Sequence, residues 1–401
     1  VNGLKTFTGE RSADILPYVE RIEVIKGPAS ALFANTSPGG TVNTVTKKPL
    51  DENRKAVNFS VGSFKTIRIT SDFTGPMNRS HTLLYRLNLA YQTAGSFRAL
   101  QDKQSFVAAP SVSFLPNDKT RINFDLVYID DNGRNDRGQP SYSPVNGVRD
   151  LYATPIGLSL SRVNDYVKAR KLFSTLSLQH NFSDHVAFNL SYLKGSYHED
   201  LREHRTSNTN AVDEDGNVVP DLMEMRYNYR ITDNATDNLT SYFTFKFNTG
   251  ALEHQLLTGY DFIQSADGLG NTTAEARGYL SADGKSAINK YDPSKKDRYL
   301  IVDGRPVPNV PSVDLHNPDY TISDPNKYIS LSVQDKLGKY YTQGVYIQDQ
   351  VSWNKWKALL SLRQQYYTDI MDYGKPVTSR VNQKALLPRV GLVYTPVNAV
   401  S

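Results

Sequence analysis

The sequence contains no cysteine and no long apolar run. The absence of cysteine from its 401 residues excludes a disulfide-linked scaffold, a thiolate metal site and a cysteine nucleophile. No stretch approaches the roughly 18 consecutive apolar residues that a transmembrane helix requires. A membrane β-barrel remains open as a class, because only alternate residues of its strands face lipid.

The charge balance and the aromatic content narrow the classes further. The 46 Lys and Arg residues exceed the 41 Asp and Glu residues by five, which is a modest excess for this length and hints at an anionic ligand or an anionic lipid. No basic cluster with interleaved aromatic residues indicates nucleic acid. The 25 Tyr and 16 Phe residues are typical of the aromatic girdles of a membrane barrel, and equally of a soluble carbohydrate-binding β-protein.

Beyond the first 49 residues, apolar and polar side chains alternate as they do in β-strands. Ile122, Phe124 and Leu126, for example, alternate with Asn123 and Asp125. A soluble sandwich shows the same period with its faces exchanged, so alternation alone does not choose between the two. Twelve strands are predicted, of which the eighth is compatible with two shorter pieces: 55–64, 66–75, 82–94, 104–115, 119–130, 172–182, 185–198, 226–247, 253–265, 339–353, 356–371 and 384–395.

The lengths of the connections favour the membrane barrel. Tight turns are predicted at 75–78, 116–118, 183–185, 249–251 and 354–355, and long connections at 131–171, 199–225 and 266–338. Short and long connections alternate from the fourth strand onward, which is typical of outer-membrane barrels with short periplasmic turns and long extracellular loops. Loops of this length are expected to be functional.

Three ordered motifs occupy residues 19–49. Glu-Arg-Ile-Glu-Val-Ile-Lys-Gly-Pro fills 20–28, Ser-Pro-Gly-Gly fills 37–40, and Val-Asn-Thr-Val-Thr-Lys-Lys-Pro fills 42–49. The β-branched residues predict two short strands, and the Gly-Pro and Gly-Gly pairs predict the turns that end them. Each turn alone is compatible with any small α+β domain, whereas the ordered series is far more specific.

This series resembles the C-terminal end of the plug domain of TonB-dependent outer-membrane receptors of the ferric-siderophore type. The resemblance implies an all-β transmembrane fold, a plugged antiparallel β-barrel of the 22-strand type in the bacterial outer membrane. Residues 1–50 would be the C-terminal part of the plug, and residues 51–401 the N-terminal part of the barrel. Since about twelve strands cannot enclose a plug, the expectation is a chain truncated at both ends, without its signal peptide, TonB box and first half of the plug.

The function that the resemblance implies is binding of a ferric siderophore at the extracellular face and its import in a TonB-energised step, without covalent chemistry and without a cofactor. The implied partners are TonB with its inner-membrane motor proteins, reached through the missing N-terminal part, and outer-membrane lipid and lipopolysaccharide. Import of cobalamin, haem or an oligosaccharide is the alternative. An outer-membrane barrel enzyme is a further alternative, but no Gly-x-Ser-x-Gly motif supports it.

The resemblance also suggests ligand-binding residues. The last plug apex loop would be residues 6–12, in which Phe7 could pack on an apolar or catechol group, and Glu10 and Arg11 provide charge. Arg134 and Arg137 belong to a first long loop whose Asp-Arg-Gly-x-Pro motif is similar to one in siderophore receptors. Solvation in ordinary polar loops is the competing interpretation for all five residues.

A second set of residues would have structural roles in the plug. Lys26 stands where many members of the family have Arg. In those members the Arg joins an ion-pair cluster that helps to lock the plug in the barrel. Since Lys lacks the two-pronged hydrogen bonding of a guanidinium, the resemblance does not predict a full cluster of this kind for this chain. The predicted structural residues are Glu20, Arg21, Lys26, Gly27, Pro28, Gly39 and Gly40.

Four histidines suggest a metal site only at first sight. The six-residue spacing of His198 and His204 is not a ligand signature. No metal site is predicted at His180, His185, His198 or His204. The charged residues around the last two are expected to form a rim that is solvated or binds divalent ions bridging lipopolysaccharide.

Overall fold

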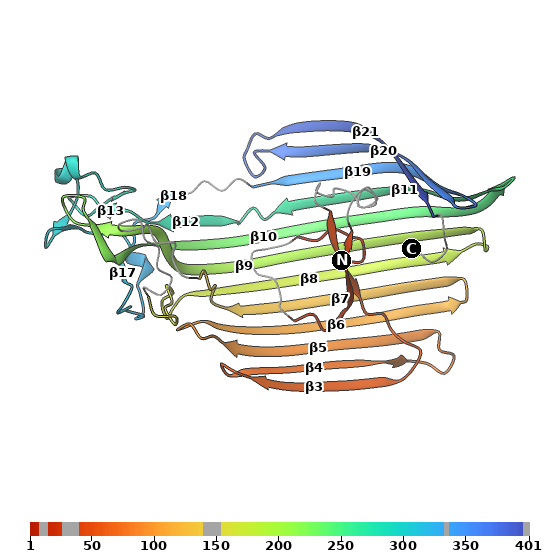
Figure 1. Ribbon diagram of the computed structural model, residues 1–401, viewed down its shortest axis with the longest axis horizontal. Coiled ribbons are helices and arrows are strands. Elements are labelled where there is room, and N and C mark those ends of the chain that lie inside the picture. The colour runs from red at the N-terminus through yellow and green to blue at the C-terminus, as the bar shows by residue number, and fades with distance from the viewer. Residues whose placement is uncertain (8–14, 26–39, 139–153, 333–336, 396–401) are drawn as a thin grey trace.

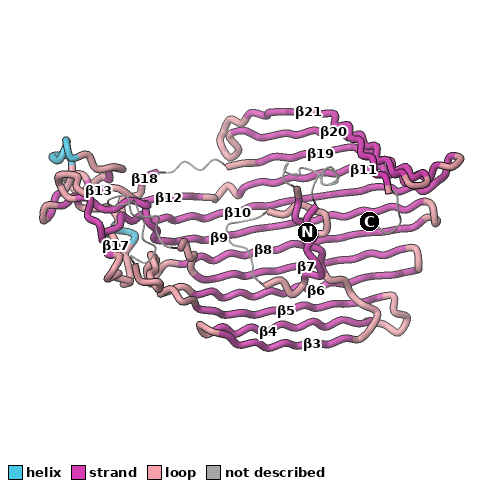
Figure 2. Tube along the Cα trace, viewed as in Figure 1, coloured by secondary structure: helices cyan, strands magenta, loops and turns pink. Residues whose placement is uncertain are grey.

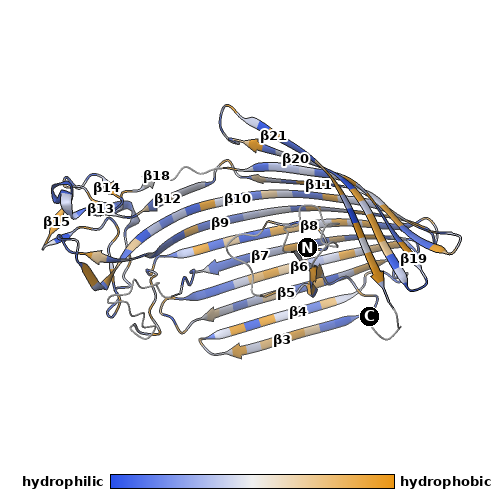
Figure 3. Cartoon of the chain, turned by 45° about the horizontal axis from the view of Figure 1, so that its top comes forward, coloured by the Kyte–Doolittle hydropathy of each residue, from blue (hydrophilic) through white to orange (hydrophobic). Residues whose placement is uncertain are grey.

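The computed structural model describes residues 1–7, 15–25, 40–138, 154–332 and 337–395, and its main feature is one large antiparallel sheet (Figure 1). Within this described part, twelve long strands lie side by side in chain order, from β3 at one edge to β21 at the other. They are β3 (Arg54–Gly62), β4 (Thr66–Pro76), β5 (Leu83–Gly95), β6 (Asp102–Asn117), β7 (Thr120–Gly133), β8 (Tyr166–Asn181), β9 (Val186–Val212), β10 (Val218–Thr249), β11 (Leu252–Asp267), β19 (Lys339–Trp353), β20 (Trp356–Met371) and β21 (Ser379–Tyr394). The sheet is curved and open, with β20 and β21 turned across the direction of β3 and β4 (Figure 3).

The two faces of this sheet differ in polarity, as the alternation predicts. We call the face that contacts the N-terminal residues the inner face, and the opposite one the outer face. The inner face buries polar side chains that include Ser105, Ser111, Ser113, Asn123, Asp125 and Thr342. The outer face exposes large apolar side chains that include Phe106, Phe114, Phe124, Leu172, Leu176, Val345, Ile347 and Leu360. Such a distribution suits strands that meet lipid on one side.

The N-terminal residues form a separate two-stranded sheet on the inner face. Strand β1 (Val19–Ile25) pairs antiparallel with β2 (Thr41–Thr46). Ile15 and Tyr18 pack against an apolar patch of the sheet made of Ala90, Val107, Ala109, Val127, Ile129 and Phe173. Burial is the larger cause, and the nearby charge of Asp131 the smaller one, of a rise in the pKa of Tyr18 to about 12.

The segment that joins this small sheet to β3 is attached to the inner face by charged groups. Asp72 on β4 accepts hydrogen bonds from Arg86 at 2.8 and 2.7 Å and from Lys47 at 3.1 Å. Arg86 also donates to the carbonyl oxygen of Lys48 at 2.8 Å, and the Lys48 ammonium pairs with Asp125 on β7. Residues 47 and 48 are therefore held by three strands of the sheet, β4, β5 and β7.

The strands end in short turns at one end of the sheet, which we call the short-turn end. Connections 77–82, 118–119, 182–185, 250–251 and 354–355 lie there. Trp353 and Trp356, the two tryptophans of the sequence, face each other across the last of these turns. Both side chains are exposed. Aromatic side chains at this position fit a girdle at a membrane interface.

The opposite end, the long-loop end, differs from the prediction in one connection. Residues 199–225 are not a long loop, because β9 and β10 continue as a pair through this region and are joined by a turn at 213–217. The outer face of the extension is covered by protein: Met223, Met225 and Tyr227 pack with Leu158 and Val313 of two other connections. A strand covered in this way needs no lipid-facing apolar pattern, which is why its mostly polar sequence suggested a loop.

The connection between β11 and β19 carries its own short elements, drawn at the left of Figures 1 and 2. It contains β12 (Thr272–Ala276), β13 (Tyr279–Leu280), β14 (Ala287–Ile288), η3 (Pro293–Arg298), β15 (Ile301–Val302), β16 (Arg305–Pro306), β17 (Val313–Asp314), η4 (Pro325–Lys327) and β18 (Leu331–Ser332). Strands β12 and β17 pair with β10, which fixes this connection to the main sheet. Among the residues described, no helix has the length and apolar character needed to cross a membrane.

Candidate functional site

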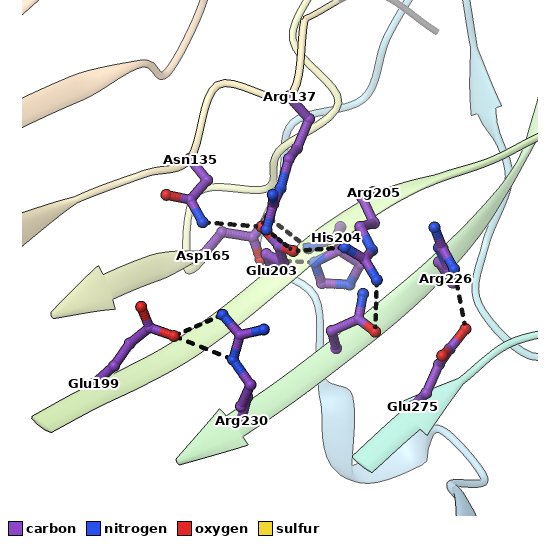
Figure 4. Close-up of polar contacts among 11 residues, drawn as sticks. Asn135, Arg137, Asp165, Glu199, Glu203, His204, Arg205, Arg226, Arg230 and Glu275 are labelled. Atoms are coloured by element: carbon purple, nitrogen blue, oxygen red, sulfur yellow. Dashed lines mark hydrogen bonds and ion pairs between the residues drawn. The ribbon is translucent and has the colours of Figure 1, made fainter. Parts of the chain in front are cut away.

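Charged side chains gather on the inner face at the long-loop end (Figure 4). Glu199, Glu203 and Arg205 lie at alternate positions of β9, and Arg226 and Arg230 do so on β10. Side chains two or four residues apart on a strand share a face, and Tyr197, in the same series, pairs with Lys171 of the inner face. The connections add Arg137, Glu275 and Arg277. We call these eight residues the arginine wall: Arg137, Glu199, Glu203, Arg205, Arg226, Arg230, Glu275 and Arg277.

Glu203 is the buried acceptor in the first part of the wall. Arg137 donates to both of its carboxylate oxygens, at 2.7 and 3.1 Å, and Arg205 approaches it at 3.5 Å. Asn135 adds a hydrogen bond of 3.5 Å. The structure thus places the predicted ligand residue Arg137 on the inner face, in a two-pronged ion pair with Glu203 of β9, which lies 66 residues further along the chain.

Glu199 is the buried acceptor in the second part. Arg230 donates to one of its oxygens at 2.6 and 3.1 Å, and the hydroxyl of Tyr197 donates to the other at 2.6 Å. The ring of Phe7 lies 5.1 Å from the ring of Tyr197, and the ammonium of Lys171 lies 5.6 Å from the same ring. Phe7, predicted from the resemblance, is therefore brought next to the wall.

Glu275 on β12 is shared by two arginines. Arg226 and Arg277 approach the same carboxylate oxygen, at 3.5 and 3.4 Å. Among the side chains that the structure describes in the wall, five guanidinium groups face three carboxylates, so two positive charges are in excess. A wall of this kind is able to bind anions, since guanidinium groups present rigid forks of N–H donors to oxygen ligands.

Arg134 has a different environment from Arg137. Its guanidinium donates to the carbonyl oxygen of Leu100 at 3.0 Å, to Asp102 at 2.5 Å and to the carbonyl oxygen of Val163 at 2.5 Å. These contacts tie the start of the 134–165 connection to its end and to the neighbouring β5–β6 connection. A ligand contact by Arg134 stays a prediction.

The predicted structural residues of the N-terminal part are only partly described. Glu20 and Arg21 lie on β1, where Arg21 donates to Glu23 at 2.7 Å, and Gly40 has a φ of 106° just before β2, a conformation that favours glycine. Lys26, Gly27, Pro28 and Gly39 lie outside the described residues, as do the predicted ligand contacts Glu10 and Arg11. The roles assigned to all of them stay predictions.

The expected charged rim around the histidines is divided between the two faces. The side chain of His204 points to the opposite face of the sheet from that of Glu203. It is buried on the outer face, where it contacts Asp165 at 2.7 Å and Tyr328 at 3.1 Å. His198 pairs with Asp233 at 2.8 Å. Over the described ranges, no three His, Cys, Asp or Glu side chains are grouped in a way that could hold a metal ion.

Sequence reasoning missed Arg205, Arg226, Arg230 and Arg277, although a signal was present. Charges recur at spacings of two and four along 199–205 and at 226 and 230, which is the period of one strand face. The predicted loop at 199–225 hides this period for Arg205, whereas Arg226 and Arg230 open the predicted strand 226–247 and Arg277 lies in the predicted connection 266–338.

Known proteins similar to this chain were identified by sequence and by structure. The family described as "TonB dependent receptor-like, beta-barrel" matches residues 110–401. The metal-pseudopaline receptor CntO of Pseudomonas aeruginosa is 26% identical over 391 residues, covering 94% of this chain and 48% of that protein. The ferrichrome outer membrane transporter/phage receptor of Escherichia coli is 26% identical over 401 residues, covering 91% and 47%. The chain thus spans about half the length of the curated relatives it matches.

Two solved structures share the fold. The siderophore receptor PiuA from Acinetobacter baumannii superposes with a TM-score of 0.72 at 20% identity, over 95% of this chain and 52% of that one. FpvAI in its complex with pyocin S2 superposes with a TM-score of 0.75 at 18% identity, over 95% and 44%. The predicted all-β barrel fold is confirmed by these comparisons, and the strands of this chain form a part of such a barrel, in one sheet that is not closed.

Proposed function

The chain belongs to the TonB-dependent receptor family of the bacterial outer membrane, and we propose from this that it is part of a receptor that binds a ferric siderophore at the extracellular face and imports it in a TonB-energised step. The family is one of transport receptors and not of enzymes, so the alternative of a barrel enzyme is set aside. Import of cobalamin, haem or an oligosaccharide is the competing proposal.

The observation that carries the proposal is the arginine wall at one end of a polar inner face. An iron chelate has to pass along the inner face of a barrel, where polar side chains replace its hydration. In this proposal the long-loop end is extracellular and the short-turn end periplasmic, because outer-membrane barrels place long loops outside. The outer face contacts lipid, and its extracellular rim adjoins lipopolysaccharide.

The domain assignment of the proposal follows from the packing of the N-terminal residues. Residues 1–50 are proposed as the C-terminal part of a plug, which is supported by the packing of Ile15 and Tyr18, just before β1, on the inner face. Residues 51–401 are barrel wall. Glu20, Arg21, Lys26, Gly27, Pro28, Gly39 and Gly40 keep their proposed structural roles in the plug. TonB with its motor proteins acts on the plug of the intact receptor.

The ligand site of the proposal lies between the plug and the arginine wall. Phe7 reaches the wall through Tyr197, and Arg137 is already on the inner face. Both are proposed to contact the chelate, together with Arg205 and Arg226, whose side chains are only partly buried. Glu10, Arg11 and Arg134 remain proposed contacts on the strength of the resemblance alone.

Uptake of radioactive iron by cells that express the full-length receptor tests the proposal. The cells are offered a panel of ferric siderophores, with and without a functional TonB system. Uptake of one chelate that disappears without TonB is expected. Uptake that persists without TonB would indicate a passive pore, and no iron uptake despite correct insertion would favour another cargo.

A further inference from the structure

Arg205 and Arg226 form an unusual pair in the arginine wall. They lie directly opposite each other on β9 and β10, in the register that also pairs Asn228 with Glu203. Directly opposed residues of antiparallel strands have Cβ atoms roughly 5 Å apart, and like charges in that position destabilise a sheet. Such a pair is stable when an anion lies between the two guanidinium groups.

The carboxylates nearby do not satisfy this need. Arg205 experiences the fields of Arg226, Glu203, Arg137 and Glu275. Glu203 is bound in two-pronged fashion by Arg137, and Glu275 is shared by Arg226 and Arg277 at 3.4 to 3.5 Å. Five guanidinium groups carry about 25 N–H donors, whereas three carboxylates offer about 12 lone-pair sites. Donors therefore exceed acceptors about twofold.

Four buried donor atoms show the same excess individually. Within the described part of the chain, the Nε atoms of Arg205, Arg226 and Arg277 and the Nδ2 atom of Asn228 are buried and have no hydrogen-bond partner. Buried donors without acceptors are costly, and native proteins rarely keep them without a reason. These four atoms are themselves closed to solvent, so they record the shortage of acceptors within the wall, and a ligand reaches the wall through the exposed parts of the Arg205 and Arg226 side chains.

Burial shows which groups a ligand meets. The Glu203 side chain retains 6% of its exposure, whereas the side chains of Arg205 and Arg226 retain 28% and 26%. The carboxylates thus lie beneath, and the guanidinium groups form the accessible layer. The electrostatic surface that a solute meets on this part of the inner face is cationic.

We infer that Arg205 and Arg226 bridge an oxyanion of the cargo, so that the transported chelate is an anionic one that carries free carboxylate arms. The inference rests on the proposed function and narrows its substrate class. A two-pronged hydrogen-bond pattern from each guanidinium to one carboxylate fits the fork geometry of arginine. A neutral chelate gains nothing from this pair.

The experiment measures binding to the purified full-length receptor by isothermal titration calorimetry. The probes are ferric citrate, as a ferric tricarboxylate, and a neutral ferric trihydroxamate. The variants are Arg205→Gln, Arg226→Gln and the double variant. The matched control is Arg202→Gln, which lies on the same strand but on the outer face, over the ring of Tyr229.

The expected result is a loss of affinity for ferric citrate of about tenfold to a hundredfold in each variant, because a hydrogen bond between charged groups is removed. The control is expected to bind like the parent, and the trihydroxamate is expected to respond to none of the changes. Equal weakening of both probes, or no change for ferric citrate, would overturn the inference. Thermal unfolding distinguishes loss of ligand binding from loss of structure. Because each variant relieves the repulsion between Arg205 and Arg226, the variants are expected to unfold at the same temperature as the parent or at a higher one.

Inorganic phosphate distinguishes the possible sources of the oxyanion. If phosphate displaces ferric citrate from the parent and does not bind the double variant, the same pair binds both, as inferred. If phosphate binds the parent and ferric citrate does not, the pair serves free phosphate or a lipid headgroup and the inference is wrong. TonB-dependent uptake of a neutral chelate, unaffected by the variants, would refute the inference and leave the proposed function intact.

Discussion

Asp72 holds the attachment of residues 47 and 48 to the inner face, and its replacement by Asn tests this attachment. Asp72 is the counter-ion of Arg86 and of Lys47. The Arg86 side chain retains only 2% of its exposure. In the Asp72→Asn variant this charge stays buried without a counter-ion, next to the ammonium of Lys47.

The magnitude follows from the cost of a buried unpaired charge, which is about 3–5 kcal/mol. Asp72 itself keeps 14% of its exposure, so solvent screens part of the effect and the lower value of about 3 kcal/mol applies. Detachment of residues 47 and 48 hydrates Arg86 and removes Lys47, and therefore relieves the cost. The equilibrium for local opening is expected to rise about a hundredfold.

Tryptic cleavage of the Lys47–Lys48 bond measures this opening, because a protease cuts the transiently open state. The next bond precedes Pro49 and resists trypsin, so the product is unambiguous. Mass spectrometry of the full-length receptor in detergent should show cleavage about a hundredfold faster in Asp72→Asn. Asp184→Asn, in an exposed short turn, is the control. A change of less than about threefold in Asp72→Asn would refute the reasoning.

Two further predictions concern the outer face and the long-loop end. Leu360→Lys on the outer face should lower the free energy of unfolding by about 2–4 kcal/mol near the bilayer centre, whereas Ser361→Lys on the inner face should be tolerated. The temperature at which the folded band disappears in electrophoresis measures the stability of both variants. Equal effects of the two changes would contradict the assignment of faces. Hydrogen bonds from Ser294 and Lys295 lower the pKa of Asp292 from 3.8 to about 2, so the cap of η3 is stabilising above pH 4 and this contribution is lost as the pH falls toward 2. Peptic cleavage of the Tyr299–Leu300 bond, directly after η3, should be faster in Asp292→Asn than in the parent at pH 4, and the two rates should converge as the pH approaches 2; a ratio independent of pH would contradict this prediction.

The strands of this chain were predictable wherever one face meets lipid and the other does not. Phe124 and Leu126 alternate with Asn123 and Asp125, and the structure separates the two pairs as expected. The extension of β9 and β10 was not predictable in this way. Its outer face is buried under other connections, so polar and apolar residues occur on both faces, and the alternation of apolar with polar residues is lost even though charged residues still recur on one face.

The sequence points to single residues of the candidate site but not to their contacts. Residue types and the resemblance predict Phe7 and Arg137 as ligand contacts; the structure places Arg137 in the arginine wall and Phe7 beside it, and the ligand contacts themselves stay predictions. Their partners Tyr197 and Glu203 belong to a strand far along the chain, and no local pattern specifies which strands become neighbours of a loop. The excess of donors over acceptors in the wall emerges only when β9, β10 and β12 are placed side by side.

The position of the two tryptophans has an optical consequence. Trp353 and Trp356 face each other at the short-turn end, so the tryptophan emission of this chain originates from a single point, and quenching by lipids brominated at known depths would report the depth of that point in the bilayer. The arginine wall lies at the other end of the sheet, on β9, β10 and the connections next to them. A change in emission on adding a chelate would therefore record a structural change transmitted along the whole length of the sheet, without any attached dye.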